Sequence, residues 1–503
     1  MPCDNNDHAM PRIPDERPLN PKPEIVDALR RILPPASVLS TPAELGPYEC
    51  DGLTAFAQRP LAVALPETVA QVQAVLKLCS AQGVPVVARG AGTGLSGGAL
   101  PLADGVLLSL AKFNRRIDID PDNRTARVEP GVRNLAISEA AAPHGLYYAP
   151  DPSSQIACTI GGNVAENSGG VHCLKYGLTV HNIVRLKLVT IDGELFEVGS
   201  EALDSPGLDL LALMTGSEGM LAVIVEVTVK LLPQPERAQA LLAAFDNVET
   251  AGAAVAEIIG AGIVPAGLEM MDNPAIRAAE DFVHAGYPVE AAAILICELD
   301  GFNAEVSVEV MRVRDLLLAA GATDVRTARD DAERMSFWKG RKAAFPAVGR
   351  ISPDYYCMDG TIPRKELPTV LNRIAALSSQ YGLRVANVFH AGDGNLHPLI
   401  LYDANIPGEL DRAEELGGEI LTLCVEVGGT VTGEHGVGVE KLNQMCVQFT
   451  NDELAQMHAV KAAFDPHGLL NPGKAVPTLH RCAELGAMHV HHGELKFPEL
   501  PRF

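Results

Sequence analysis

A glycine-rich loop, Gly90–Gly98, limits the folds open to this chain, because it directly follows a short apolar segment that predicts a strand. The loop contains the spacing G-x-G-x-x-G at Gly92, Gly94 and Gly97. A Rossmann fold requires a helix to begin here, so that the helix N-terminus meets the pyrophosphate. Residues 99–105 instead carry a proline and a turn, and no Lys-Ser or Lys-Thr pair closes the loop as in a P-loop. Both of those nucleotide-binding folds are therefore disfavoured.

Two further glycine-rich segments follow, at residues 150–170 and 215–219. Glycine has no Cβ, so a row of its backbone N–H groups can approach a diphosphate closely and donate hydrogen bonds to it. Each cluster taken alone is equally well explained as a tight turn. Three clusters within one predicted domain favour a large bound dinucleotide.

The pattern of apolar residues predicts an α+β protein with two domains. An amphipathic helix is predicted at residues 68–82, with Thr68 and Gln71 placed as a capping box. A strand is predicted at residues 223–229, whose alternate valines should lie on one face. Two prolines within Leu231–Pro235 cannot continue a central strand, so this segment is predicted to be a domain boundary.

Chain length also requires more than one core, since 503 residues exceed the roughly 250–300 that a single core serves. Beyond the boundary, long helical segments alternate with single strands, which is typical of a layered α+β or α/β domain. The predicted divisions are a lead-in at 1–50, a first domain at 51–235, a second at 236–475, and a tail at 476–503 that carries His489, His491 and His492.

Composition excludes several classes of function. The formal net charge of −23 opposes binding to nucleic acid or to anionic lipid. No apolar run of about 18 residues predicts a membrane span, and the polar start offers no signal-peptide core. The ten cysteines include no C-x-x-C pair, which argues against an iron–sulfur cluster or a four-cysteine zinc site. The sequence therefore predicts a soluble cytoplasmic protein with reduced thiols.

Several motifs together carry a family resemblance. Residues 89–94, 150–154, 161–163 and 177–182 resemble the FAD-binding, PCMH-type domain of the vanillyl-alcohol oxidase and p-cresol methylhydroxylase flavoproteins. Members that bind FAD covalently through the first of these loops have a histidine among its glycines. Gly90–Gly98 has none, so the resemblance implies non-covalent FAD. The predicted FAD contacts are Gly90, Ala91, Gly92, Thr93, Gly94, Pro150, Asp151, Ser154, Gly161, Gly162, Asn163, Gly169 and Val225.

Histidines and a carboxylate cluster in the second predicted domain. His390 and His397 flank a Gly-Asp-Gly-Asn turn, across which both imidazoles can converge, and Glu434 follows later in the chain. Two neutral imidazoles and a carboxylate suit Zn²⁺ or Mn²⁺ and leave coordination positions open for a substrate. The alternative is that both histidines only hydrogen-bond the turn.

A flavin and a metal together indicate oxidation of an alcohol, in which a hydride goes to the flavin and a base takes the hydroxyl proton. His435, beside Glu434, is the candidate base, and a core histidine is the alternative. Arg341 lies in a basic run next to Trp338 and is the candidate partner of a substrate carboxylate. A solvated helix face is the alternative interpretation of that run.

The metal motif resembles the FAD-linked D-2-hydroxy-acid dehydrogenases, and the match extends from about Tyr48 to Lys474. That resemblance implies His390, His397 and Glu434 as metal ligands, His435 as the base and Arg341 as the carboxylate-binding residue. It also implies a PCMH-type FAD-binding domain followed by an α+β FAD-linked oxidase C-terminal domain that holds the substrate.

Within that family the chain is most similar to the flavin subunits of bacterial glycolate-oxidising complexes, on residues 151–182, 351–360 and 480–492. This likeness implies oxidation of glycolate to glyoxylate, with D-lactate as a secondary substrate. It also implies a second flavin-type subunit and an iron–sulfur subunit that pass electrons to the respiratory chain, and through them an association with the inner membrane.

Three alternatives stay open at this point. The first is a D-lactate or other D-2-hydroxy-acid dehydrogenase, because the sequence does not identify the side chains that contact the substituent on C2 of the substrate. The second is a metallohydrolase that uses the histidine and glutamate site alone. The third is a flavin-binding subunit that only relays electrons or builds the complex.

Overall fold

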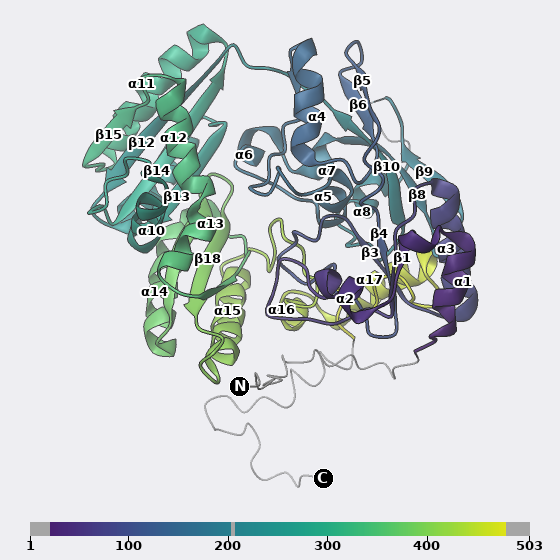
Figure 1. Cartoon of the computed structure of the whole chain (residues 1–503). Helices are drawn as coiled ribbons and strands as arrows, with labels where there is room; N and C mark the ends of the chain where they lie inside the picture. Colours follow the sequence, from purple (N-terminus) through teal and green to yellow (C-terminus); the bar gives the residue numbers. More distant parts are fainter. Residues whose placement is uncertain (1–20, 203–206, 479–503) are drawn as a thin grey trace, which may run out of the picture.

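The computed structural model of the chain describes residues 21–202 and 207–478 (Figure 1). Its first unit opens with a four-stranded sheet in the order β1-β2-β4-β3, in which β2, β4 and β3 run parallel. The strands are β1 (Val38–Leu39), β2 (Ala62–Ala64), β3 (Val86–Arg89) and β4 (Val106–Ser109). The helices of this part are α1 (Glu24–Ile32), α2 (Pro42–Leu45) and α3 (Val69–Gln82), with short 3₁₀ turns at Pro35–Ser37 and Gly46–Tyr48.

Helix α3 confirms the predicted helix but only half of its predicted capping box. Thr68 Oγ1 accepts a hydrogen bond from the Gln71 backbone N–H at 3.3 Å. The Gln71 side chain instead accepts from the N–H of Glu67, at 2.7 Å. Val72, Leu76 and the other buried residues of α3 face the parallel sheet, so the periodicity in this segment identified its core face.

A five-stranded antiparallel sheet completes the first unit, in the order β5-β6-β10-β8-β9. Its strands are β5 (Ile117–Asp120), β6 (Thr125–Val128), β8 (Ile183–Val189), β9 (Leu195–Gly199) and β10 (Val223–Lys230). Two-residue strands β7 (Leu146–Tyr147) and β11 (Leu232–Pro233) pair beside it. The helices here are α4 (Asn134–Ala141), α5 (Ile160–Glu166), α6 (Cys173–Tyr176), α7 (Thr179–Asn182) and α8 (Leu210–Met214), with a 3₁₀ turn at Ala142–His144.

The prediction that the valines of β10 share one face is wrong. Val223 and Val225 pack in the core beneath α3, whereas Val227 and Val229 pack in the core on the opposite face of the sheet. The pairing with β8 shifts register between Ile224 and Glu226, as at a β-bulge. A bulge inserts one residue and reverses which side chains face which core, which an alternating pattern cannot reveal.

The second unit is a seven-stranded antiparallel sheet with helices on both faces, in the order β15-β12-β14-β13-β17-β18-β16. Its strands are β12 (Arg237–Phe245), β13 (Gly267–Asp272), β14 (Ala293–Gly301), β15 (Asp324–Thr327), β16 (Asp354–Cys357), β17 (Arg384–His390) and β18 (Asn395–Tyr402). Helices α9 (Val248–Gly260), α11 (Asn303–Ala319), α14 (Leu367–Tyr381) and α15 (Glu409–Glu426) cover one face. Helices α10 (Asn273–Val283), α12 (Asp331–Lys342) and α13 (Ala344–Ala347) cover the other, with 3₁₀ turns at Val348–Arg350 and Arg364–Glu366.

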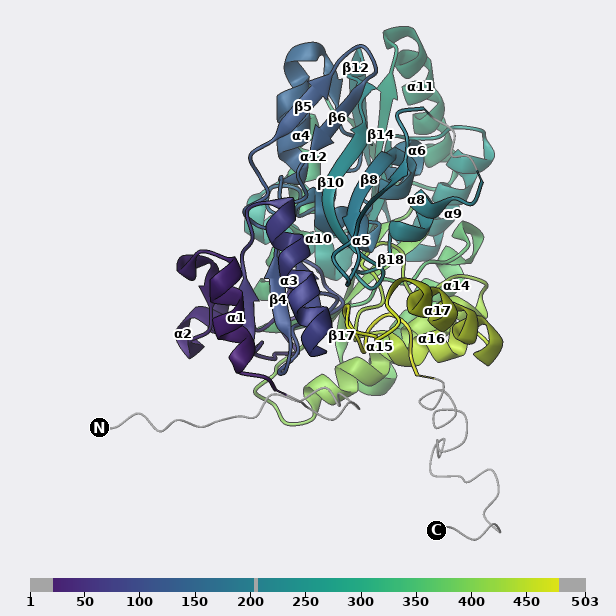
Figure 2. The same ribbon diagram turned by 90° about the vertical axis from the view of Figure 1, so that its right-hand side faces the viewer.

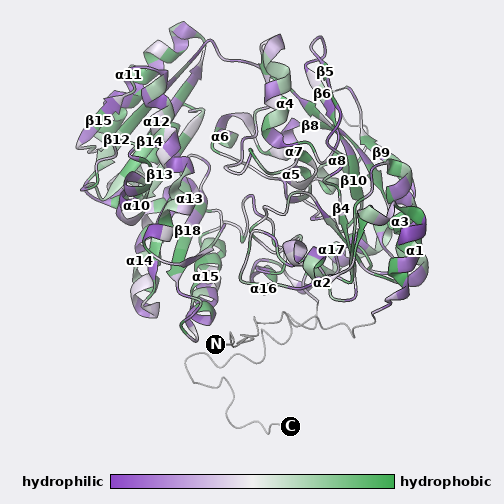
Figure 3. Cartoon of the chain, in the orientation of Figure 1, coloured by the Kyte–Doolittle hydropathy of each residue, from purple (hydrophilic) through white to green (hydrophobic). Residues whose placement is uncertain are grey.

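Successive side chains of the central strands point to opposite faces of the sheet and so pack in the two cores of this unit. In β12, Leu241 and Ala243 enter the core beneath α9 and α11, whereas Ala240 and Leu242 enter the core beneath α10 and α12. Strand β13 is buried along its whole length although it carries two carboxylates, whereas its neighbour β14 is mainly hydrophobic (Figure 3). The α+β class and the sequence of a first domain followed by a layered second domain are confirmed.

Both ends of the described chain pack on the first unit. Strand β1 pairs with β2, and Ile25 of α1 enters the core beneath α3, so much of the predicted lead-in belongs to this unit. Helices α16 (Leu442–Gln448) and α17 (Asn451–Phe464) leave the second sheet. Val460 and Phe464 of α17 pack against the core of the five-stranded sheet, and Figure 1 shows α17 near β3 and β1. In Figure 2, α1 lies beside α3 in the same unit. Leu470 bridges to Val86 of β3, and Asn471 donates to the Gly98 carbonyl at 3.0 Å. We therefore propose the domain boundary at residue 235, with residues 451–475 returning to the first unit.

The predicted histidine-bearing tail, with His489, His491 and His492, lies almost wholly outside the described residues. Within residues 21–202 and 207–478, no helix combines the length and the apolar character needed to cross a bilayer.

A charged cluster links the two units at His172. Its Nδ1 lies 3.0 Å from Asp151 of the first unit, and its Nε2 lies 3.3 Å from Glu298 on β14 of the second. Burial opposes the charged form, but the two carboxylates outweigh it and raise the pKa of His172 from 6.5 to about 10. The folded protein therefore binds this proton more tightly than the unfolded chain does.

This shift predicts a pH-dependent contribution to stability. Because the folded pKa is raised, the contribution is complete below about pH 6.5 and is lost as the pH rises towards 10. We expect H172Q to lower the free energy of unfolding by about 1–3 kcal/mol at pH 6, after allowing for partial exposure, and by much less at pH 10. Urea unfolding followed by Trp338 fluorescence measures this, with the exposed His144→Gln as control. A destabilisation that stays constant between pH 6 and pH 10 would contradict the assignment.

Candidate active site between the two units

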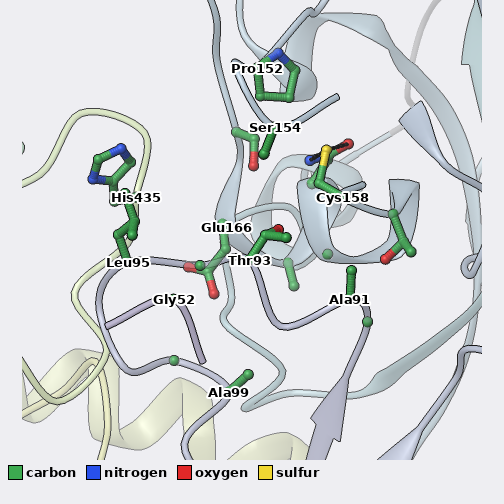
Figure 4. A pocket seen from close by; sticks show the side chains of 18 of the residues that line it. Gly52, Ala91, Thr93, Leu95, Ala99, Pro152, Ser154, Cys158, Glu166 and His435 are labelled. Carbon is green, nitrogen blue, oxygen red and sulfur yellow. Dashed lines mark hydrogen bonds between the residues drawn. The ribbon is translucent and has the colours of Figure 1, made fainter. Parts of the chain in front are cut away.

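A cavity of about 660 Å³ lies between the two units and joins the glycine-rich loops to the histidine cluster. Figure 4 shows loop residues that line this cavity together with His435. Loops from the first unit form one part of its lining, and Arg341, His390, His397, Glu434 and His435 form another. Nine of the thirteen predicted cofactor contacts line it, namely Gly90, Ala91, Gly92, Thr93, Gly94, Ser154, Gly161, Gly162 and Asn163. The third glycine cluster reaches it through Glu218 and Gly219.

Close packing explains why the loops are built from glycine. A Cβ on Gly90 would collide with the side-chain oxygen of Thr159, and a Cβ on Gly161 would lie 2.6 Å from the Cβ of Pro130. The Gly52 N–H donates to the Gly94 carbonyl at 2.8 Å, which ties the first loop to the preceding chain. These contacts bring backbone from separate segments of the first unit to one wall of the cavity.

Four of the predicted contacts lie outside the cavity lining. The carbonyl of Pro150 accepts a hydrogen bond from Asn134 at 3.1 Å, and Asp151 pairs with His172 in the cluster that links the units. Gly169 lies against Glu434, because a Cβ there would be 2.5 Å from Glu434 Oε2. Val225 is only 2% exposed in the core beneath α3.

The strand β10 does contribute to the cavity, but through other residues than Val225. Ala222, just before β10, and Ile224 in the strand line the cavity. Successive strand residues point to opposite faces, so Val225 points away from it.

Two histidines and a glutamate meet at the rim of the second sheet. His390 ends β17 and His397 lies on β18, the antiparallel neighbour of β17. Nε2 of His390 lies 3.1 Å from Oε1 of Glu434, and Nε2 of His397 lies 3.0 Å from the same oxygen. The turn between the strands thus places both imidazoles around one carboxylate, a donor set that suits a divalent cation.

Glu269 on β13 connects this cluster to Arg341. Its Oε1 lies 2.8 Å from Nδ1 of His390, and its Oε2 accepts from Nε of Arg341, also at 2.8 Å. Sequence reasoning missed Glu269, although a lone carboxylate within the apolar run Gly-Leu-Glu-Met-Met was a signal. Carboxylates in this position orient the histidine ligands of metal sites.

Arg341 is completely buried at the end of α12, so the alternative of a solvated helix face does not apply to it, although Lys339 of the same run is exposed. One side of its guanidinium group pairs with Glu269, and Nη1 has no hydrogen-bond partner among the described residues. Since Arg341 also lines the cavity, it offers an unpaired donor to an anionic group there.

Asp359 shapes the loop that carries Glu434 and His435. It accepts hydrogen bonds from the backbone N–H groups of Gly433, at 3.0 Å, and His435, at 2.9 Å, and it contacts the buried Lys441 at 3.2 Å. Sequence reasoning did not single out Asp359. Its only signal was an Asp-Gly pair soon after a strand.

His435 stacks on His397, with ring centroids 4.8 Å apart and an interplanar angle of 11°. Its Nε2 lies 4.0 Å from Oε1 of Glu434, and its Nδ1 has no partner among the described residues. Burial lowers the pKa of His435 to about 4, so the imidazole is neutral at pH 7 and can accept a proton.

Two further carboxyl groups, Glu166 and Glu218, line the cavity and were not predicted. Glu218 accepts from the N–H groups of Val437 and Gly438, both at 2.7 Å. Glu166, labelled with His435 in Figure 4, has an unpartnered Oε2, and burial together with Glu218 raises its pKa well above the usual range. Burial therefore favours the protonated form of a carboxyl group that lies beside the loop of His435.

Comparison with known proteins is consistent with this arrangement. Residues 60–199 match the FAD binding domain family, and residues 234–475 match the C-terminal domain of FAD linked oxidases. The glycolate oxidase subunit GlcD of Escherichia coli (strain K12) is 70% identical, over 95% of this chain and 96% of that protein. GlcD of Bacillus subtilis (strain 168) is 38% identical, over 85% and 91%.

More distant relatives extend the group. A D-lactate dehydrogenase of Anaerostipes hadrus is 33% identical, over 83% of this chain and 89% of that protein. The crystal structure of p-cresol methylhydroxylase with substrate bound superposes with a TM-score of 0.77 and 19% identity, covering 91% of this chain and 97% of that one, so it shares the fold. On its two domains and its near full-length match, the chain belongs to the FAD-linked oxidases, in the group of the glycolate oxidase subunits GlcD.

Proposed function

We propose that this protein oxidises glycolate to glyoxylate, using non-covalently bound FAD. One observation carries the proposal: a single cavity connects the glycine loops to a buried arginine, a histidine with an unpaired nitrogen and a three-donor cluster. The identity to proteins named glycolate oxidase subunits supports glycolate as the substrate. FAD, when bound, supplies the hydride acceptor.

The first-unit loops fit FAD. Backbone from Gly90–Gly94 and Gly161–Asn163 lines the cavity, and glycines there leave N–H groups open to a diphosphate. No histidine occurs within Gly90–Gly98, so this loop offers no imidazole for a covalent link.

This assignment predicts that a side chain at Gly162 displaces the cofactor. A Cβ there would have only Thr159 Oγ1 within 4 Å, at 3.5 Å, so a larger side chain projects into open space. We expect G162V to fold but to bind FAD at least about tenfold more weakly, because its methyl groups occupy cofactor space. The FAD content of purified protein and fluorescence titration of apoprotein measure this, with the exposed Gly349→Val as control. Wild-type FAD affinity in G162V would place the cofactor elsewhere.

We propose His390, His397 and Glu434 as ligands of a divalent cation, Zn²⁺ or Mn²⁺. Nε2 of His390 and Nε2 of His397 already lie within 3.1 Å of the same Glu434 oxygen. Glu269 lies 2.8 Å from the other ring nitrogen of His390. Each ring nitrogen of His390 faces a carboxylate, so each needs a positive partner. Either both nitrogens carry a proton, as in an imidazolium, or a metal cation takes the place of one of the two protons. The cation, when bound, acts as a Lewis acid that lowers the pKa of an alcohol.

The remaining roles fall to two cavity residues. Arg341 binds the substrate carboxylate through its unpaired Nη1, while Glu269 fixes the other side of the guanidinium group. His435 would take the hydroxyl proton. With FAD bound, the carbon that bears this hydroxyl would give up its hydride, so that the alcohol loses two electrons and two protons in all.

D-lactate is the second candidate substrate, because the relatives include a D-lactate dehydrogenase at 33% identity. Comparing kcat/KM for the two acids, with an artificial electron acceptor, decides between them. We expect glycolate to be preferred, and a preference of tenfold or more for D-lactate would reverse the assignment.

We also propose that the protein is cytoplasmic and works as one subunit of a larger enzyme, with a second flavin-type subunit and an iron–sulfur subunit. The names of its relatives, which call them subunits, support this. The absence of any C-x-x-C pair from the sequence agrees with a partner that carries the cluster. Through that partner, electrons would reach the respiratory chain at the inner membrane.

A further inference from the structure

A second group of metal-ligating side chains borders the His390, His397 and Glu434 cluster. It consists of Cys357, His397 and His435, each of which offers one donor atom, all within 4.8 Å of one another. Cys357 ends β16 and is opposite Leu399 of β18, so the thiol lies close to His397 on the neighbouring strand. His435 reaches the group from the loop held by Asp359.

Both imidazoles have a buried nitrogen that nothing among the described residues satisfies. Their Nε2 atoms face Glu434, at 3.0 Å for His397 and 4.0 Å for His435, whereas the Nδ1 atoms of both are unpartnered. A buried nitrogen left without a partner is destabilising, which favours a ligand that satisfies both. The side chain of His397 is only 2% exposed, so bulk solvent does not satisfy it.

Cys357 contributes a buried thiol. Its residue is 5% exposed, and the Sγ atom donates one hydrogen bond, 3.4 Å to the Met358 carbonyl. Burial and the carboxylates of Glu440 and Asp359 disfavour the thiolate, whereas Lys441, which pairs with both carboxylates at 3.4 and 3.2 Å, favours it. A bound cation would supply the further positive charge that a thiolate needs at this position.

We propose that Cys357, His397 and His435 form a second site, for a soft divalent cation such as Zn²⁺ or Cd²⁺. One thiolate and two imidazoles match the preferences of these ions, whereas Mn²⁺ prefers oxygen ligands. On binding, the Cys357 thiol releases its proton to solvent and a sulfur–metal bond forms. When both clusters are occupied, His397 also releases its ring N–H proton to solvent and binds one cation through each nitrogen. No electron transfer takes place.

Occupancy of this site blocks turnover, because a cation on His435 removes the lone pair that accepts the substrate proton. This consequence rests on the proposed function, whereas the binding of the cation does not. The chain therefore has two cation sites with opposite effects, one whose occupancy supports the reaction and one whose occupancy stops it.

Metal stoichiometry tests the site without turnover. Holoenzyme is equilibrated with Cd²⁺, freed of excess ion by gel filtration, and assayed by plasma mass spectrometry. We expect C357A and H435Q each to hold one cadmium fewer per chain than wild type, while E434Q, which alters only the first cluster, keeps the cysteine-dependent ion. Cys297→Ala on β14 and the half-buried Cys50→Ala are the matched thiol controls and should not change the count.

X-ray absorption of the zinc-loaded wild type gives a second readout that needs no variant. One sulfur neighbour at about 2.3 Å is expected, and it should disappear in C357A but not in C50A. In turnover assays, C357A should need at least tenfold more Cd²⁺ for half-inhibition. Equal cadmium counts in wild type, C357A and H435Q, or a zinc shell without sulfur, would overturn the proposal.

Discussion

Replacing His435 with glutamine lowers kcat for glycolate oxidation by about 10²–10⁴-fold, the range typical for loss of a general base, while FAD stays bound. The imidazole lines the cavity, has an unpartnered Nδ1, and is held by stacking on His397 and by the hydrogen bond from its backbone to Asp359. Glutamine is polar and of similar reach but does not accept a proton at neutral pH. The glycine loops that hold the cofactor are not altered.

Steady-state kinetics with an artificial acceptor, together with the visible spectrum of bound flavin, measure this effect. The exposed His467→Gln serves as control and should retain wild-type kcat. A flavin-loaded H435Q with unchanged turnover would show that another group is the base, or that the subunit only relays electrons.

Glu434→Gln removes the charged member of the three-donor cluster and should lower kcat/KM by about 10³-fold or more, equivalent to roughly 4 kcal/mol of transition-state stabilisation. Glutamine keeps nearly the same shape, so the backbone contacts of Glu434 to Asp359 persist. The two imidazoles then lack the carboxylate that completes the donor set, and affinity for a cation that supports the reaction falls.

The metal content of E434Q, measured on dialysed holoenzyme, distinguishes the loss of a ligand from unfolding. Flavin content and the far-ultraviolet circular dichroism spectrum should match wild type, and the exposed Glu426→Gln should behave as wild type throughout. An E434Q protein that is metal-free yet fully active would mean that the cluster is not a metal site. The metallohydrolase alternative would instead predict activity without flavin.

Local sequence identified those parts of the site that lie on single short segments. Gly90–Gly94 and Gly161–Asn163 could be predicted because a close approach of backbone needs glycine, and the structure places both at the cavity. His390 and His397 could be predicted because a short turn brings them together. These inferences needed no knowledge of which strands pair.

Residues that act across strands could not be found in this way. Glu269 reaches His390 only because β13 and β17 are neighbours, and Asp359 reaches the loop of His435 from a distant part of the chain. Nothing in the local pattern specifies either pairing. The bulge in β10, which divides its valines between two cores, and the return of α17 to the first unit are likewise set by tertiary packing.

The net charge of the chain did not exclude an anionic substrate. The chain carries −23 overall, yet the cavity presents Arg341 and exposed backbone N–H groups to its contents. Donors at hydrogen-bond distance outweigh distant surface charges, because salt largely screens charges that lie more than about 10 Å away.

In the proposed function, one cavity brings a short 2-hydroxy acid to FAD. Anaerobic titration of the purified protein with glycolate tests this arrangement, because the titration needs no partner subunit and no added acceptor. We expect yellow protein whose visible flavin absorption is bleached by glycolate and regained when an acceptor is added. Persistence of the oxidised flavin spectrum with excess glycolate, D-lactate and other short 2-hydroxy acids would contradict it.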